Sequence, residues 1–258
     1  MRKIAILVLS LLLTVAMFGV AAPGVSAHGN QACLDGDART FLSGTTDSSP
    51  NYGRTGVKAA ISLRIDICST GADDDSLTAA WIGLAPRLGS GASQIVQMGI
   101  LACREGPSIP GSVCNTFPGQ IRYFYAFGGC TALTGPYGRD AGPADLNPHT
   151  YRIERTASDF VLYFPNGTTI FIDRGNISVS CFAAGNLRAE WETEKWDRGD
   201  SSGSVSARTT FSAMQQRNTF DSSFHNINKP IGNCSWVMAT APHNSACTMG
   251  GNGMQAWD

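Results

Sequence analysis

Alternation of apolar and polar positions dominates this chain and predicts β-strands. The clearest case follows Gly56, where nearly every second residue over 57–67 is a large aliphatic one. Further strands are expected at 79–84, 94–101, 120–127, 151–155, 160–164, 168–172, 187–196, 205–211 and 235–239. Residues 211–217 are equally consistent with a short helix. Asn166-Gly167 between two alternating runs predicts a hairpin. The pattern therefore indicates an all-β fold: a two-sheet antiparallel β-sandwich.

The segment 187–196 shows the strictest alternation. As a strand it points Glu190, Glu192 and Glu194 to one face and places apolar residues such as Trp191 behind them. A solvated surface would explain three such acids, and so would a functional site. Glu190 and Glu192 would lie ~6.7 Å apart along the strand. Their repulsion, roughly 2.5 kcal/mol at an effective dielectric of about 20, is expected to raise the pKa of one carboxyl group.

Three other predicted strands carry side chains suited to binding. Trp81 and Gln97 each lie opposite the apolar face of their strand. Gln97 is followed two residues later by Gly99, which indicates close approach by a ligand or another backbone. The segment 120–127 is aromatic on both faces, and both cannot be core in a half-exposed sheet. We therefore expect one stripe, Tyr123 and Tyr125, to line a groove beside the acids.

The ends of the chain predict export. A basic start, an apolar run and the small residues before His28 predict a signal peptide over 1–27. An extended N-terminal arm is expected over 28–55, ahead of a β-sandwich domain over 56–258. The full chain has a formal net charge of −1, and loss of Arg2 and Lys3 with the signal leaves 17 − 20 = −3. This balance argues against nucleic acid or a membrane as a partner of the cleaved chain. We expect a secreted monomer.

The cysteines support an oxidising compartment. All eight follow the predicted signal peptide, and an even count in an exported chain predicts up to four disulfides. The loops 103–114 and 234–247 are the easiest to close, but the connectivity stays open. No pair has the spacing of a zinc site, so no metal or other cofactor is expected.

Three short segments resemble strands of the glutamic peptidases, or eqolisins. Residues 80–84, Ala-Trp-Ile-Gly-Leu, are similar to the family's Ala-Trp-Val-Gly-Ile. Residues 95–99, Ile-Val-Gln-Met-Gly, are similar to its Ile-Leu-Gln-Thr-Gly, and residues 189–191, Ala-Glu-Trp, to its Ala-Glu-Phe/Trp. The order of the three segments matches as well. The resemblance implies a concanavalin A-like jelly roll and a secreted endopeptidase.

The same resemblance implies roles for individual residues. Glu190 would be the general base that activates water, and Gln97 would stabilise the oxyanion on a polypeptide substrate. The substrate-binding residues would be Trp81, Tyr123, Tyr125 and Glu192. The chain departs from the family at Tyr125, where the family's aromatic strand has a glutamate.

The acidic strand supports two alternatives. Glu190-Trp191-Glu192-Thr193-Glu194 also resembles the acidic strand of concanavalin A-like β-glucanases, in which Glu190 and Glu194 would be the catalytic carboxylates acting on a polysaccharide. A lectin-like carbohydrate-binding module without catalysis is the third possibility. Gln97 discriminates among them, because the peptidase alone requires it.

Overall fold

The computed structural model describes residues 37–45, 53–64, 77–86, 95–103, 113–128, 138–173, 187–197, 203–204, 207–227, 231–236, 246–250 and 253–257. The predicted signal peptide over 1–27 lies outside these residues. Within them no helix is long and apolar enough to cross a membrane.

The strands are β1 Asp37–Thr45, β2 Arg54–Ser62, β3 Leu77–Pro86, β4 Val96–Cys103, β5 Ile121–Phe127, β6 Arg139–Pro143, β7 His149–Arg155, β8 Asp159–Tyr163, β9 Thr169–Asp173, β10 Leu187–Asp197, β11 Gly203–Ser204, β12 Ala207–Asn218, β13 His225–Asn226, β14 Ile231–Trp236, β15 Ala246–Gly250 and β16 Gly253–Trp257, with one short helix, α1 Val113–Thr116.

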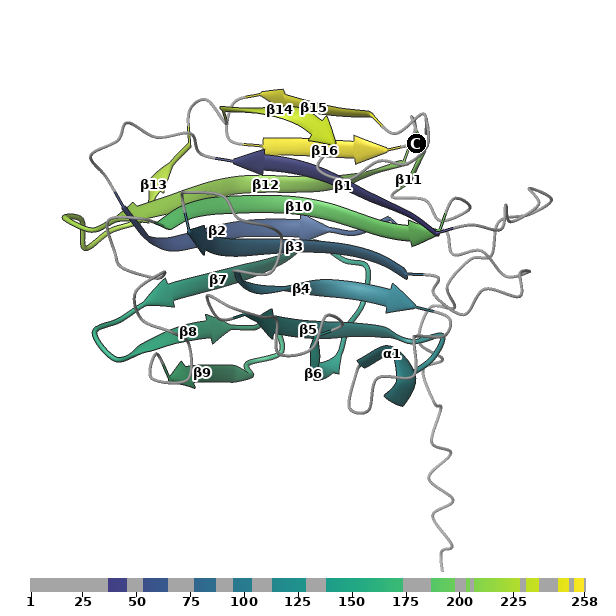
Figure 1. The fold of residues 1–258 in the computed structure, drawn as a ribbon, viewed down its shortest axis with the longest axis horizontal. Coiled ribbons are helices and arrows are strands. Elements are labelled where there is room, and N and C mark those ends of the chain that lie inside the picture. Colours follow the sequence, from purple (N-terminus) through teal and green to yellow (C-terminus); the bar gives the residue numbers. More distant parts are fainter. Residues whose placement is uncertain are drawn as a thin grey trace, which may run out of the picture.

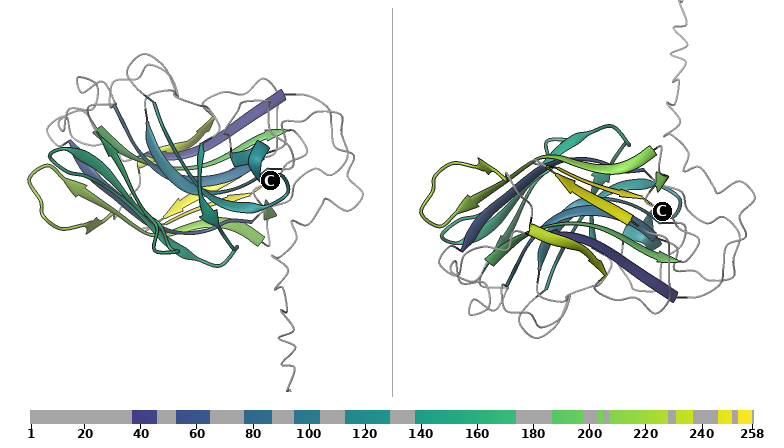
Figure 2. Two further views of the ribbon diagram at one scale, coloured as in Figure 1. Left: turned by 90° about the horizontal axis from the view of Figure 1, so that it is seen from below. Right: turned by 90° about the horizontal axis from the view of Figure 1, so that it is seen from above.

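These strands form two antiparallel sheets that pack face to face (Figures 1 and 2). The seven-stranded sheet has the order β14-β1-β10-β3-β4-β5-β6. The second sheet has the order β15-β16-β12-β2-β7-β8-β9, and β11 and β13 also pair with β12. The predicted two-sheet antiparallel β-sandwich is therefore confirmed.

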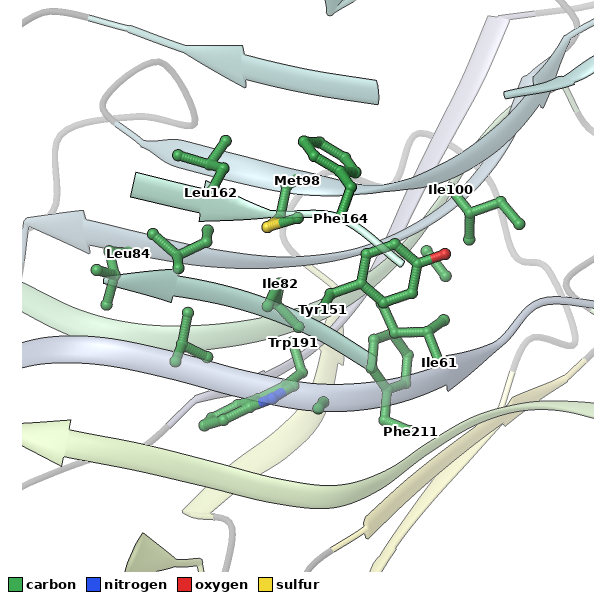
Figure 3. Packing of buried hydrophobic residues seen from close by; sticks show 14 of the residues in the cluster. Ile61, Ile82, Leu84, Met98, Ile100, Tyr151, Leu162, Phe164, Trp191 and Phe211 are labelled. Carbon is green, nitrogen blue, oxygen red and sulfur yellow. The ribbon is translucent and has the colours of Figure 1, made fainter. Parts of the chain in front are cut away.

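The core lies between the two sheets. Period-2 alternation sends one set of side chains inward from each strand, and the largest of them meet in Figure 3. The seven-stranded sheet contributes Trp191, Ile82, Leu84, Met98 and Ile100. The facing sheet contributes Ile61, Tyr151, Leu162 and Phe211. The inward stripes predicted for 57–63, 79–84 and 94–101 are thus the ones that enter the core between the sheets.

One segment differs from the prediction, and one that the sequence left open is resolved. The predicted arm over 28–55 contributes a strand to the domain, because residues 37–45 form β1 between β10 and β14. Residues 211–217 are strand and not helix, since β12 runs on to Asn218. A bulge interrupts its pairing with β2, and Ala213 there has a φ of 48°. That irregularity breaks the period-2 pattern from which a strand is predicted.

The predicted hairpin at Asn166-Gly167 is present. It connects β8 to β9, and Gly167 has a φ of 85°, which favours glycine. The predicted disulfide loop 103–114 is closed by a Cys103–Cys114 bond. The other easily closed loop, 234–247, lies outside the residues whose side chains are described.

Candidate active site

Strand β10 lies between β1 and β3 in the seven-stranded sheet. Its apolar positions, Trp191 among them, pack into the core between the sheets. Its polar positions therefore point to the opposite side of the sheet, which we call the outer face. These outer-face residues of β10 are Arg188, Glu190, Glu192 and Glu194.

Backbone pairing aligns Glu190 and Gln97 in one row across the sheet. Glu190 on β10 pairs with Gly83 on β3, and Gly83 pairs with Gln97 on β4. Neighbouring strands lie roughly 4.8 Å apart, so the Cα atoms of Glu190 and Gln97 are separated by about 9.6 Å. Both side chains leave the same face, and the residue between them has none. Glu190 and Gln97 therefore flank Gly83 on the outer face of the sheet.

Apolar side chains form the floor between these two groups. A Cβ atom on Gly83 would lie 2.6 Å from Cδ1 of Ile95 and 3.1 Å from Cζ3 of Trp81. Ile95 and Trp81 are each only 4% exposed. They occupy the volume that any larger residue at position 83 would need, so glycine is required here for packing.

Gly99 has a different neighbour. The predicted close approach at this residue comes from the backbone of β3, because a Cβ atom on Gly99 would lie 2.1 Å from the carbonyl oxygen of Ala80. The glycine lets β3 and β4 pair closely below Trp81. The position therefore has a structural explanation that involves no ligand.

A cation pairs with Glu190. Nε of Arg188 lies 2.5 Å from Oε1 of Glu190, and the Glu190 side chain is only 7% exposed. Burial raises the pKa of Glu190, while the charge and the hydrogen bond of Arg188 lower it in part. The sequence pattern did not identify Arg188. Its signal was a basic residue two positions before Glu190, on the same strand face.

Glu192 has the opposite environment. This residue is 7% exposed, and burial raises its pKa well above the ordinary value. The charges of Glu190 and Glu194 raise the pKa of Glu192 further, against a smaller lowering by Arg188. The repulsion expected between neighbouring acids therefore raises the pKa of Glu192. The two carboxyl groups accordingly differ in the pH at which each ionises.

Trp81 forms a hydrogen bond with Glu194, the third glutamate on the outer face of β10. Its indole Nε1 donates a hydrogen bond to Oε2 of Glu194 at 3.3 Å. The backbone of Trp81 pairs with that of Glu192 on β10. The indole nitrogen therefore reaches along β10 from Glu192 to Glu194. The prediction that Trp81 lies on the same face as Gln97 and the acids agrees with this arrangement.

Tyr123 and Tyr125 do not line this face, and that part of the prediction is wrong. Tyr123 belongs to the core between the sheets, with its ring 5.9 Å from that of Tyr151 and 6.1 Å from that of Phe164. Burial raises the pKa of Tyr123 to about 12. Tyr125 packs against the same core. The outer face of β5 instead presents Phe124, which the opposite choice of stripe would have identified.

Phe124 belongs to a second apolar cluster on the outer face, which sequence reasoning missed. The Cys103–Cys114 disulfide holds α1 against the sheet, and Val113 packs into this cluster. The cluster extends along β3 and β4 to Trp81 and Ile95. A short disulfide loop containing an apolar residue was the available signal. The part of the outer face beyond Trp81 is consequently covered by α1, whereas Gln97 stays partly exposed.

Within the described residues, no three His, Cys, Asp or Glu side chains converge as they would around a metal ion. The side chains of Glu190 and Gln97 offer proton transfer by a carboxyl group and hydrogen-bond donation by an amide.

No protein-family model and no curated protein matches the chain. Among solved structures it is similar to a scytalido-glutamic peptidase with a transition state analog inhibitor, at 12% identity and a TM-score of 0.42, covering 87% of this chain and 98% of that one. It is similar to SCP-B, a member of the eqolisin family of peptidases, in a complex with the tripeptide Ala-Ile-His, at 11% identity and a TM-score of 0.40 with the same coverage. It is also similar to a glycoside hydrolase family 16 endo-glucanase from Bacteroides ovatus, at 13% identity and a TM-score of 0.36, covering 63% of this chain and 70% of that one.

Proposed function

We propose that this protein is a secreted endopeptidase of the glutamic type, in which Glu190 is the general base and Gln97 stabilises the oxyanion. The observation that carries the proposal is the row Glu190–Gly83–Gln97 on one face of the sheet. It brings the two groups required by the chemistry to either side of a position without a side chain.

The proposed step is addition of water to a peptide carbonyl. The Glu190 carboxylate takes a proton from water as the water oxygen bonds to the carbonyl carbon. Negative charge then develops on the carbonyl oxygen, and the Gln97 amide donates a hydrogen bond to it, a contact worth ~3 kcal/mol. Arg188 supports this role because it favours the ionised form of Glu190 inside a site that otherwise disfavours charge.

The proposal includes export of the chain, with cleavage of the signal peptide after Ala27. The Cys103–Cys114 disulfide supports it, because structural disulfides persist in oxidising compartments. The mass of the secreted product should correspond to a chain that begins at His28. A secreted product that retains residues 1–27 would contradict this part.

Digestion of an unbiased peptide library from about pH 3 to about pH 7 tests the activity. Glu190→Gln and Gln97→Ala should each lower turnover by ~10²-fold or more while the protein still unfolds cooperatively. Glu194→Gln is the matched control, since it alters the same residue type on the same strand face. Peptide cleavage that persists unchanged in both Glu190→Gln and Gln97→Ala would contradict the mechanism.

A β-glucanase is the second candidate, supported by the Trp81–Glu194 hydrogen bond. That contact holds a second acid on the face from which Glu190 projects, and an indole beside two carboxyl groups suits a sugar ring. In this case Glu194→Gln abolishes hydrolysis of β-glucans and Gln97→Ala has little effect. If the wild-type protein turns over neither substrate class, a carbohydrate-binding module is favoured.

A further inference from the structure

We propose that Glu192 is the proton donor of the reaction, protonating the amide nitrogen as it leaves, while Glu190 acts only as the base. This inference rests on the proposed peptidase function. It assigns to Glu192 a chemical step, whereas the sequence predicted only that Glu192 helps to bind the substrate.

The two carboxyl groups lie close together but face different charges. Glu190 has Arg188 at 2.5 Å. Within the described part of the chain, no cation pairs with Glu192, and its neighbours along β10 on the outer face are the carboxyl groups of Glu190 and Glu194. The residues opposite Glu192 in the sheet are Trp81 on β3 and Ser43 on β1, neither of which is charged.

Burial reinforces this difference. Glu190 and Glu192 are 5% and 7% exposed, so each can ionise only where a neighbouring cation offsets the lost hydration. Arg188 supplies that offset mainly to Glu190. Both pKa values are raised by burial. That of Glu192 is raised further, because the like charges of Glu190 and Glu194 add to the effect of burial. Over an intermediate pH range Glu190 is a carboxylate and Glu192 a carboxylic acid, which is how environments separate an acid from a base.

The reaction needs both forms. The Glu190 carboxylate receives a proton from water, and the carbon–oxygen bond forms. When the carbon–nitrogen bond then breaks, the electron pair goes to nitrogen, which takes the proton of Glu192. Glu190 is left protonated and Glu192 ionised, and transfer of one proton from Glu190 to Glu192 restores the starting state. A peptide nitrogen cannot leave as an anion, so it requires such a donor.

Two substrates with the same acyl group test the assignment. One is a peptide amide. The other is a 4-nitrophenyl ester, whose leaving group departs without a proton. Glu192→Gln should lower kcat/KM for the amide by ~10²-fold or more and leave the ester within about threefold of wild type. Glu190→Gln should lower both. Glu192→Asp, which retains an acid, should recover part of the amide activity.

The pH profiles give a second measurement. With the wild-type protein, amide hydrolysis should fall as pH rises through the pKa of Glu192, and ester hydrolysis should show no such fall. Asp173→Asn, an exposed position on β9 in the other sheet, is the control and should match wild type on both substrates.

The outcomes separate the two proposals. If the wild-type protein cleaves no peptide, the proposed function fails and the role of Glu192 fails with it. If peptides are cleaved but Glu192→Gln lowers amide and ester hydrolysis equally, or lowers neither, the proposed function stands and Glu192 is not the proton donor.

Discussion

Nε of Arg188 lies 2.5 Å from Oε1 of Glu190, two residues along the same strand. The pair places a positive charge beside a carboxyl group that lies on the outer face of β10 and is itself buried. Without that cation, burial alone would determine the pKa of Glu190 and would raise it further. The pair therefore sets the acid side of any activity that requires Glu190 to be ionised.

Arg188→Met should move the acid limb of kcat/KM to higher pH. A general base is active only when ionised, and loss of the cation raises the pKa of Glu190, so activity should disappear at a higher pH than in wild type. Arg188→Lys keeps the charge and should shift the limb less. Peptide hydrolysis measured across pH checks this, and an unmoved acid limb in Arg188→Met would exclude Glu190 as the titrating base.

Glu192→Gln should stabilise the fold increasingly as pH rises. The pKa of Glu192 is raised in the folded protein, so its carboxyl group favours the folded state below its ordinary value near 4.5. That contribution is lost as pH rises through the folded-state pKa. Glutamine does not ionise, so the two proteins should be equally stable in acid and diverge above it. Urea unfolding at several pH values measures the divergence, and parallel curves would contradict the raised pKa.

Alanine substitutions at Gly83 and Gly99 should differ in whether they can be rescued. Gly83→Ala should cost ~1–3 kcal/mol, because the new methyl group meets Cδ1 of Ile95 at 2.6 Å. Ile95→Val removes that atom and should recover ~1 kcal/mol in the double variant. Gly99→Ala should cost ~3 kcal/mol or more, because it meets a backbone oxygen at 2.1 Å, and Ile95→Val should not help. Denaturant unfolding of the wild type, the three single variants and the two double variants measures these differences.

Removal of the Cys103–Cys114 disulfide should loosen the cover over part of the outer face. The bond closes a sequence separation of 11 residues, for which the chain-entropy relation gives ~3 kcal/mol of stability. A double alanine variant should lose about that amount. Amides of α1 should exchange with solvent faster, whereas those of the central strand β10 should not until the whole protein unfolds. Unchanged exchange at α1 would show that the packing of Val113 alone retains the helix.

Alternation along single strands was enough to predict much of this protein. Inward and outward positions were assigned correctly on 79–84, 94–101 and 187–196, because each of these segments has one face that is plainly more apolar. The many short alternating segments along the chain then predicted two packed antiparallel sheets. Trp81, Gln97 and the three acids were placed on one side of their strands by the same period of two.

The strand 120–127 shows where that period stops being informative. Both of its faces are aromatic, so the pattern predicts two stripes without indicating which of them meets the second sheet. Pairing with β4 and packing against β7 decided that question, because Tyr123 fits beside Tyr151 between the sheets and Phe124 is left for the outer face. A bulge similarly concealed the continuation of β12 through Ala213.

The identity of the acids was visible in the sequence, whereas their chemical difference was not. Glu190 and Glu192 belong to the same strand face and have the same side chain. Their pKa values separate only because folding removes water from both and places a cation against one of them. Strand pairing likewise put Gln97 in the row of Glu190, far away in sequence and two strands apart in space. Sequence determined which polar groups the strands carry, and the register of three strands together with burial decided which of them lie in one row and in which environment.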